Sequence, residues 1–226
     1  MMEVLSNYAD WWPQILRGAI WTLRLMGMSF LLAAVLALPI ALGRLSKSRT
    51  LRGLAHTYVE IVRGMPSLTL LFLIYFGLPS IGITLSAMEA AVLGLGLNGA
   101  AYVSEVYRSG IQAIEAGQRE AAQMLGLRKI QVLRHVVLPQ AFRIVLPPMG
   151  NYAISLLKDT SVASLISAPE MMLQARDLTT EHFMPLQIYT AIGLMYLAMA
   201  LPLSFLVHRL EARLSTRSPK LKEQDK

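Results

Sequence analysis

The chain has 226 residues, of which 54% are hydrophobic and only 15% are charged, whereas an ordinary soluble protein carries roughly 25% charged residues. This shortage of charge points to a lipid environment. The high apolar content, the lack of a glycine period and of heptads, and the absence of cysteine exclude a disordered chain, collagen, a coiled coil and a disulfide scaffold. The net charge of +7 is compatible with nucleic-acid binding, but the positions of the basic residues fit membrane topology better, so no nucleic-acid partner is expected.

Stretches without Asp, Glu, Lys or Arg predict membrane spans, because an unpaired charge in hydrocarbon is costly and a spanning helix needs about 20 residues. Five such stretches occur, at 25–43, 64–88, 90–104, 144–157 and 183–207. The third and fourth are short for a bilayer, so each is expected to extend into flanking polar residues or to pack inside the protein. The sequence predicts an all-α integral membrane protein, a single domain over 1–226 with five transmembrane helices. Pro39, Pro66 and Pro202 are expected to kink helices without breaking them.

The first 16 residues carry Glu3 and Asp10 but no basic residue, so they lack the positive region of a cleavable signal peptide. The first span is therefore expected to act as the insertion signal, with 1–16 on the outer face. Trp11 and Trp12 fit two readings, an anchor at the outer membrane interface or a short helix packed on the bundle.

Positive charge orients the chain, because Lys and Arg are retained on the cytoplasmic side of a membrane. Sixteen of the 21 Lys and Arg residues fall in three segments, 44–52, 108–143 and 209–226. These segments are expected to be cytoplasmic, the last as a C-terminal tail. The N-terminus is then outside and the C-terminus inside.

Several catalytic patterns are rejected. Gly94, Gly96 and Gly99 spell G-x-G-x-x-G inside an apolar stretch with no preceding strand, so they are expected to serve close helix packing, with Gly96 and Ala100 as a small-xxx-small pair. No P-loop or serine-hydrolase elbow occurs, and the four histidines lack metal-ligand spacing. No catalytic residue, metal or cofactor is expected in this chain.

The connection at 108–143 reads as two short amphipathic helices. Ala122 and Leu125 form an apolar edge of the first, and Gly126 is placed to end it in a left-handed conformation. Apolar residues recur in the second helix at Ile130, Leu133 and Val137. Periodicity alone fits a hairpin lying flat on the membrane as well as a segment that binds a partner.

The same connection carries a motif. Glu120-Ala121-Ala122, Gly126 and then Val136, Leu138 and Pro139 resemble the E-A-A-x-x-x-G-x(9)-I-x-L-P motif of ATP-binding cassette (ABC) importer permeases, with valine in place of isoleucine. The stretches 58–66, 101–105, 117–122 and 157–161 narrow the resemblance to polar amino acid permeases of the histidine, glutamine, arginine and opine type. Met65 stands where threonine is more usual in that family.

The resemblance implies a type I ABC importer-like fold whose cytoplasmic coupling helix docks on an ATPase subunit. The residues it assigns to this coupling are Gln118, Glu120, Ala121, Ala122, Gly126 and Leu127. It also implies location in the bacterial cytoplasmic (inner) membrane, a second permease chain, the same or a sister, and an extracytoplasmic solute-binding protein. Two cytoplasmic subunits would bind ATP and Mg, so this chain is not expected to be an enzyme. The alternatives are an importer of an opine or another amino-acid derivative, and a passive channel or scaffold.

Charged residues within or beside the spans are candidates for the substrate site, because a free amino acid presents a carboxylate and an ammonium group that a dry pocket must match. Glu60 and Arg63 share a helix face, and Glu105 and Arg108 repeat that spacing. The substrate-binding candidates are Glu60, Arg63, Glu105, Lys158, Asp159, Thr160 and Ser161. Structural alternatives stay open: an ion pair within each spacing, and a simple cap in which Asp159 and Thr160 satisfy backbone groups at the helix end.

Overall fold

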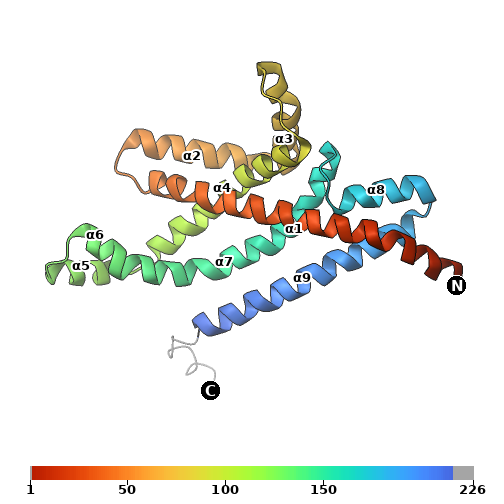
Figure 1. Cartoon of the computed structure of the whole chain (residues 1–226). Coiled ribbons are helices and arrows are strands. Elements are labelled where there is room, and N and C mark those ends of the chain that lie inside the picture. Colours follow the sequence, from red (N-terminus) through yellow and green to blue (C-terminus); the bar gives the residue numbers. More distant parts are fainter. Residues whose placement is uncertain (1, 216–226) are drawn as a thin grey trace.

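The computed structural model describes residues 2–215, and every regular element within them is a helix, as predicted. The elements are α1 (Met2–Arg44), α2 (Arg49–Gly64), α3 (Ser67–Phe72), the π-helical turn η1 (Leu73–Gly77), the 3₁₀ turn η2 (Leu78–Ile81), α4 (Ala87–Gln112), α5 (Ala116–Met124), α6 (Lys129–Val132), the π-helical turn η3 (Leu133–Val137), α7 (Leu138–Asp159), the 3₁₀ helix η4 (Thr160–Ile166), α8 (Met171–His182) and α9 (Pro185–Ser215). In Figure 1, α1 runs across the middle of the molecule and the other helices are arranged around it.

Two helices of the described part of the chain are long and apolar enough to cross a membrane by themselves. They cover Trp11–Arg44 and Pro185–Leu214, and the bent pair Arg49–Gly64 and Ser67–Ile81 adds a third if it counts as one span. The short stretches 90–104 and 144–157 lie inside helices of 26 and 22 residues. Their predicted extension into flanking polar residues is therefore confirmed, while the total of five spans stays a prediction.

The prolines behave in two different ways. Pro39 and Pro202 lie inside continuous helices, as expected. The expectation of a kink at Pro66 is wrong, because α2 ends at Gly64 and the next helical stretch sets off at 106° to it. Met65 is extended, since a residue before proline is disfavoured in the helical region. The residues 67–81 of the predicted second span, 64–88, therefore form a separate arm that turns sharply away from α2.

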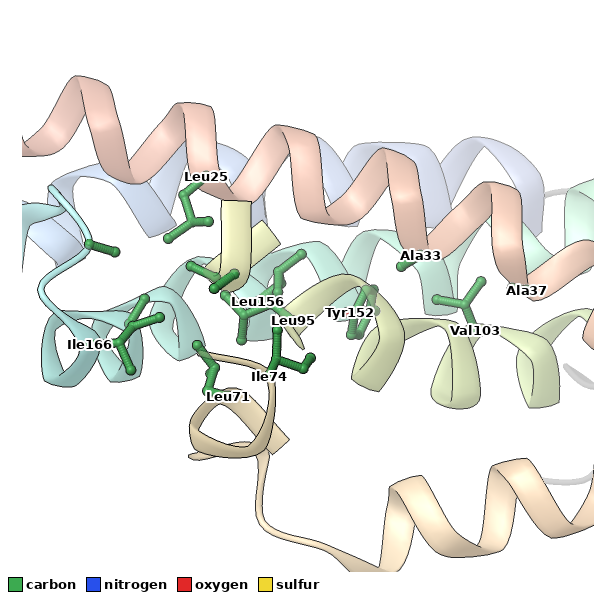
Figure 2. Close-up of a cluster of buried hydrophobic side chains, with 14 of the residues drawn as sticks. Leu25, Ala33, Ala37, Leu71, Ile74, Leu95, Val103, Tyr152, Leu156 and Ile166 are labelled. Atoms are coloured by element: carbon green, nitrogen blue, oxygen red, sulfur yellow. The ribbon is translucent and has the colours of Figure 1, made fainter. Parts of the chain in front are cut away.

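The main hydrophobic core lies where α1, α4 and α7 meet the arm. Figure 2 shows Leu25 and Ala33 of α1, Leu95 of α4 and Leu156 of α7 converging there, with Leu71 from α3 below them. All five side chains are buried. Within a membrane, close van der Waals packing of such side chains stabilises the contact between the helices.

The glycines of α4 permit close helix packing, as predicted. A methyl group on Gly96 would lie 2.6 Å from the side chain of Leu32, and one on Gly99 would lie 2.9 Å from Cβ of Ala33 and overlap the Tyr152 hydroxyl. Because no Cβ atom fits, both positions require glycine for the contact with α1 and α7.

A second buried cluster joins α8 to the start of α1 and to α9, and we call it the α8 cluster. It is built around Trp11, Ile15, Met171, Leu178 and Ile188. The Trp11 ring is 1% exposed and lies 5.6 Å from the His182 ring. Trp11 therefore packs on the bundle, and an anchor at the membrane interface stays a prediction for Trp12, which is 48% exposed.

Candidate functional site

The α5–α6 hairpin forms one end of the molecule, at the left of Figure 1. α5 ends at Met124, and Gly126 follows with φ +81°, which confirms its predicted left-handed conformation. The N–H of Gly126 donates to the carbonyl of Gln123 (2.9 Å) and that of Leu127 to the carbonyl of Ala122 (3.2 Å), so carbonyls at the helix end are satisfied. α6 then continues through η3 into α7, so the hairpin is joined directly to a core helix.

A small apolar core closes the hairpin, and we call it the hairpin cluster. It consists of Ala122 packed with Ile114, Val132 and Val137. The predicted burial of Ala122 and Val137 is confirmed, but Leu125 is 84% exposed and Ile130 is 74% exposed. Leu125 follows the end of α5 and Ile130 lies in α6, so these two apolar residues face outward, where a membrane surface or a partner could cover them.

The motif residues divide between the interior and the surface of the hairpin. Ala122 is buried and Leu127 packs against the hairpin cluster, whereas Gln118, Glu120, Ala121 and Gly126 are exposed. The tip adds an apolar surface, formed by Met124, which is 90% exposed, and Leu125. Sequence reasoning missed this tip, although two large apolar residues directly before a turn glycine are a signal for it.

Two polar contacts attach α5 to the helices of the bundle. The Arg119 guanidinium donates a hydrogen bond to the carbonyl of Ile111 in α4. The side-chain amide of Gln140 in α7 donates to Oε1 of Gln118 over 2.6 Å. The hairpin is thus held by polar contacts to both of the helices that flank it in sequence.

The first pair of substrate candidates, Glu60 and Arg63, lies exposed on α2. Oε1 of Glu60 is 3.5 Å from Nδ1 of His56, one turn earlier, and its side chain is 64% exposed. Glu60 therefore does not form the ion pair with Arg63 that their spacing allowed. In this single chain both charges face outward.

Glu105, another substrate candidate, is neutralised within the chain. Its carboxylate accepts hydrogen bonds from the guanidinium groups of Arg108, one turn further along α4, and of Arg44 at the end of α1. Arg108 also donates to the side chain of Gln112. The pairing of Glu105 with Arg108 is present as its spacing predicted, and Arg44 extends it to a second helix.

The end of α7 presents two kinds of polar group. Thr160 and Ser161 donate hydrogen bonds to the carbonyls of Leu157 and Lys158, both over 2.7 Å, so their hydroxyls satisfy the helix end. Lys158 and Asp159 are exposed. Among the described residues, no hydrogen bond or ion pair joins these two charges to Glu60 or Arg63, so this chain by itself does not assemble the four charges into one pocket.

A buried carboxylate that sequence reasoning did not single out lies at the start of α8. Glu170 is fully buried, accepts a hydrogen bond from the N–H of Leu173 (2.8 Å) and another from the Tyr196 hydroxyl (2.8 Å). Beside it, Oγ1 of Thr22 accepts from the N–H of Met171 (3.0 Å). Burial raises the pKa of Glu170, against the opposing effect of these hydrogen bonds. An acid directly before an apolar helix is the sequence signal for such a cap.

A groove of about 490 Å³ runs between α1, α4 and α7, with Phe30, Tyr107, Phe142 and Met149 among its lining residues. None of the substrate candidates lines it. Its walls are almost entirely aliphatic and aromatic, and a zwitterion has no partners for its two charges there.

The helical architecture, the membrane-spanning helices and the hairpin with its motif define the transmembrane subunit of an importer. Residues 29–216 match the family described as "Binding-protein-dependent transport system inner membrane component". The chain belongs to this family, and its fold is of the type I ABC importer kind.

The relatives include two permeases of Bacillus subtilis (strain 168). The chain is 41% identical over 186 residues to a probable amino-acid ABC transporter permease protein, YckA, covering 82% of each chain. It is 38% identical over 206 residues to the L-cystine transport system permease protein TcyB, covering 91% of this chain and 88% of TcyB. A solved structure titled as an amino acid ABC transporter with histidines superposes with a TM-score of 0.87 at 34% identity, covering 92% of this chain and 97% of the other.

Proposed function

We propose that the chain is the permease subunit of an ABC importer that moves a polar amino acid from an extracytoplasmic binding protein into the cytoplasm. Separate subunits would bind and hydrolyse ATP with Mg, and a second permease chain, the same or a sister, would complete the pore. The observation that carries the proposal is the α5 hairpin, whose Glu120-Ala121-Ala122 motif ends in a left-handed Gly126. Family membership and the names of the relatives support the amino acid as substrate.

The surface that the ATPase subunit would cover is the exposed part of the hairpin. Glu120 and Ala121 lie exposed on α5, and Met124 and Leu125 add the apolar tip. Ala122 and Leu127 would not contact the ATPase subunit directly but would hold the shape of the hairpin, since they pack in the hairpin cluster. Apolar residues this exposed on a membrane protein's polar end favour a covered interface over a surface in water.

The proposed orientation has the N-terminus outside and the C-terminus inside the bacterial inner membrane. The α1–α2 turn, the hairpin and the C-terminal end of α9 all point to the left of Figure 1. These are the segments 44–52, 108–143 and the described part of 209–226, which hold most of the basic residues; residues 216–226 lie outside the described part. Positive charge gathered at one end supports placing that end in the cytoplasm.

For the substrate, we propose contacts with Glu60, Arg63, Lys158 and Asp159. Their exposure in a single membrane-embedded chain supports this, because charges within a bilayer need a partner chain, a water-filled path or a ligand. Thr160 and Ser161 would shape the site through the helix end that they satisfy. Glu105 is the weakest member of the set, because two arginines already neutralise it.

The test of the importer function is uptake by proteoliposomes that contain the purified permease with its ATPase subunits and binding protein. Uptake of a polar amino acid that requires ATP and is blocked by vanadate is the expected result. Uptake that runs down a gradient without ATP would establish a passive channel instead. A panel of amino acids and opines offered to the binding protein would identify the substrate class.

Two sets of variants, each with its control, test the assigned surfaces. Charge reversal at Glu120 (Glu120→Lys) should separate ATP hydrolysis from uptake, whereas the same reversal at Glu181 on α8 should not. Asp159→Asn and Glu60→Gln should reduce uptake while the complex still assembles, and Asp177→Asn, an exposed acid on α8, is the matched control. Wild-type uptake by both pocket variants would remove the substrate assignment.

A further inference from the structure

Arg119 is the one arginine of α5, and its side chain turns back toward the bundle. Its guanidinium donates to the carbonyl of Ile111, in the last turn of α4. The last four carbonyls of a helix lack partners within the helix, and a cation at that end also interacts favourably with the helix dipole. Nε of Arg119 is buried without a hydrogen-bond partner, so the side chain is enclosed at this position.

The end of α4 that Arg119 binds is itself fixed to α1. Arg108 and Glu105, on the last turns of α4, bind each other, and Glu105 also binds Arg44 at the end of α1. An ionic contact of this kind joins residues 61 positions apart in the chain. A displacement of α4 at this point is therefore shared with α1.

A separate contact fixes α5 to α7. Nε2 of Gln140 donates both to Gln118 (2.6 Å) and to the carbonyl of Val136 (3.0 Å). The second bond holds the Gln140 side chain along the start of α7, in the position where it meets Gln118. α5 is thus bound from two sides, to α4 through Arg119 and to α7 through Gln118.

We propose that Arg119 and the Gln118–Gln140 pair are positioning residues that make α4 and α7 follow α5 when a bound ATPase subunit displaces it. The inference rests on the proposed docking of the ATPase at α5. Without these contacts α5 is joined to α4 by the connection at 113–115, and to α7 by the turn, by α6 and by the small hairpin cluster. Part of a displacement of α5 would then be absorbed there before it reached α4 and α7.

The test is the number of amino acids imported per ATP hydrolysed, measured on the complete complex in proteoliposomes. Arg119→Met keeps an unbranched apolar stem but removes the guanidinium and its donors, and it should lower this ratio by about two- to thirtyfold, the range found for residues that couple two sites. Gln140→Leu should lower it as well. Arg119→Lys should restore part of the ratio, because one ammonium group can still reach the Ile111 carbonyl.

Arg134→Met is the matched control, because Arg134 is an exposed arginine of the same hairpin, and its ratio should equal that of the wild type. In the positioning variants the ATPase subunit should still co-purify and hydrolyse ATP. An unchanged ratio in both Arg119→Met and Gln140→Leu would overturn the inference, as would loss of the ATPase subunit from both, which would make these residues docking contacts. Failure of the proposed function is distinguishable, because the wild type would then show no ATP-dependent uptake.

Discussion

The two ends of the molecule are built in opposite ways. At the α8 end, Glu170 is fully buried with hydrogen bonds from α8 and α9, and the α8 cluster surrounds it with large side chains. At the hairpin end, the hairpin cluster consists of one alanine, one isoleucine and two valines, while the side chains of Met124 and Leu125 are almost fully exposed.

Both ends expose large apolar side chains, since Phe183 and Leu186 beside the α8–α9 turn are 84% and 76% exposed. The difference lies in the interior: the α8 end has a large core and a buried polar network within this chain, whereas the hairpin end has a small core and a tip that the proposed ATPase subunit would cover. Buried polar groups with all their partners inside one chain specify a single arrangement. Large apolar groups left outside a small core gain their burial only in a complex. Stability should therefore depend on residues at the α8 end, and assembly on residues at the hairpin end.

The largest expected effect is at Glu170. Glu170→Ala removes the cap of α8 and leaves the hydroxyl of the partly buried Tyr196 without its acceptor, so we expect a loss of about 3 kcal/mol. Thermal unfolding of the purified chain in detergent measures it. Glu170→Gln keeps an oxygen acceptor for the cap and should lose far less. A loss of equal size in both variants would show that the ionised carboxylate, not the hydrogen bonds, holds this end together.

A smaller effect is expected at the hairpin, from backbone conformation and not from burial. Gly126→Val places a β-branched residue at φ +81°, which should cost about 1–2 kcal/mol. Gly117→Ala is the control, because Gly117 has ordinary φ and no atom within 4 Å of an added methyl group. Thermal unfolding of the two variants gives the comparison, and equal stability would mean that the turn adapts to a side chain.

Local sequence patterns were sufficient to predict several parts of this structure. The spacing of charged residues located the short apolar stretches. The absence of a side chain explained the turn at Gly126 and the tight packing at Gly96. The break at Pro66 was not predictable by the same reasoning that holds for Pro39, because neighbouring helices decide whether the freed backbone groups are satisfied.

The candidate site was harder to predict because its features depend on distant or missing partners. The Arg44 that neutralises Glu105 lies 61 residues away in sequence. Leu125 carries the same apolar signal as a core residue, since a surface that binds a partner and a surface that binds the core have similar composition. The hydrogen bond of Thr160 to the helix end is local, in contrast, and was foreseen as an alternative, although Ser161 joins it there and Asp159 does not.

The pH dependence of stability gives a finer test of the α8 end. Because burial raises the pKa of Glu170, the folded chain binds this proton more tightly than the unfolded chain does. The associated stabilisation is present at low pH and is lost as the pH rises through the folded-state pKa. As the pH rises through the raised folded-state pKa of Glu170, the melting temperature of the wild type should fall relative to that of Glu170→Gln. A parallel course of the two would mean that the carboxyl group is solvated like an ordinary glutamate.

The smallest effect on stability is expected at the hairpin tip. The double variant Met124→Ser/Leu125→Ser changes two side chains that are almost fully exposed. Because neither side chain gives up burial, unfolding of the isolated chain should change by less than about 0.5 kcal/mol. The same double variant should lose most of its association with the ATPase subunit, since an apolar contact of two large side chains would be removed from the interface. Ile81→Ser, at the end of η2, removes an apolar residue that is 70% exposed and should leave that association intact. If the tip variant keeps its ATPase subunit but unfolds more easily, the hairpin would be part of the chain's own core and the contrast between the two ends would disappear.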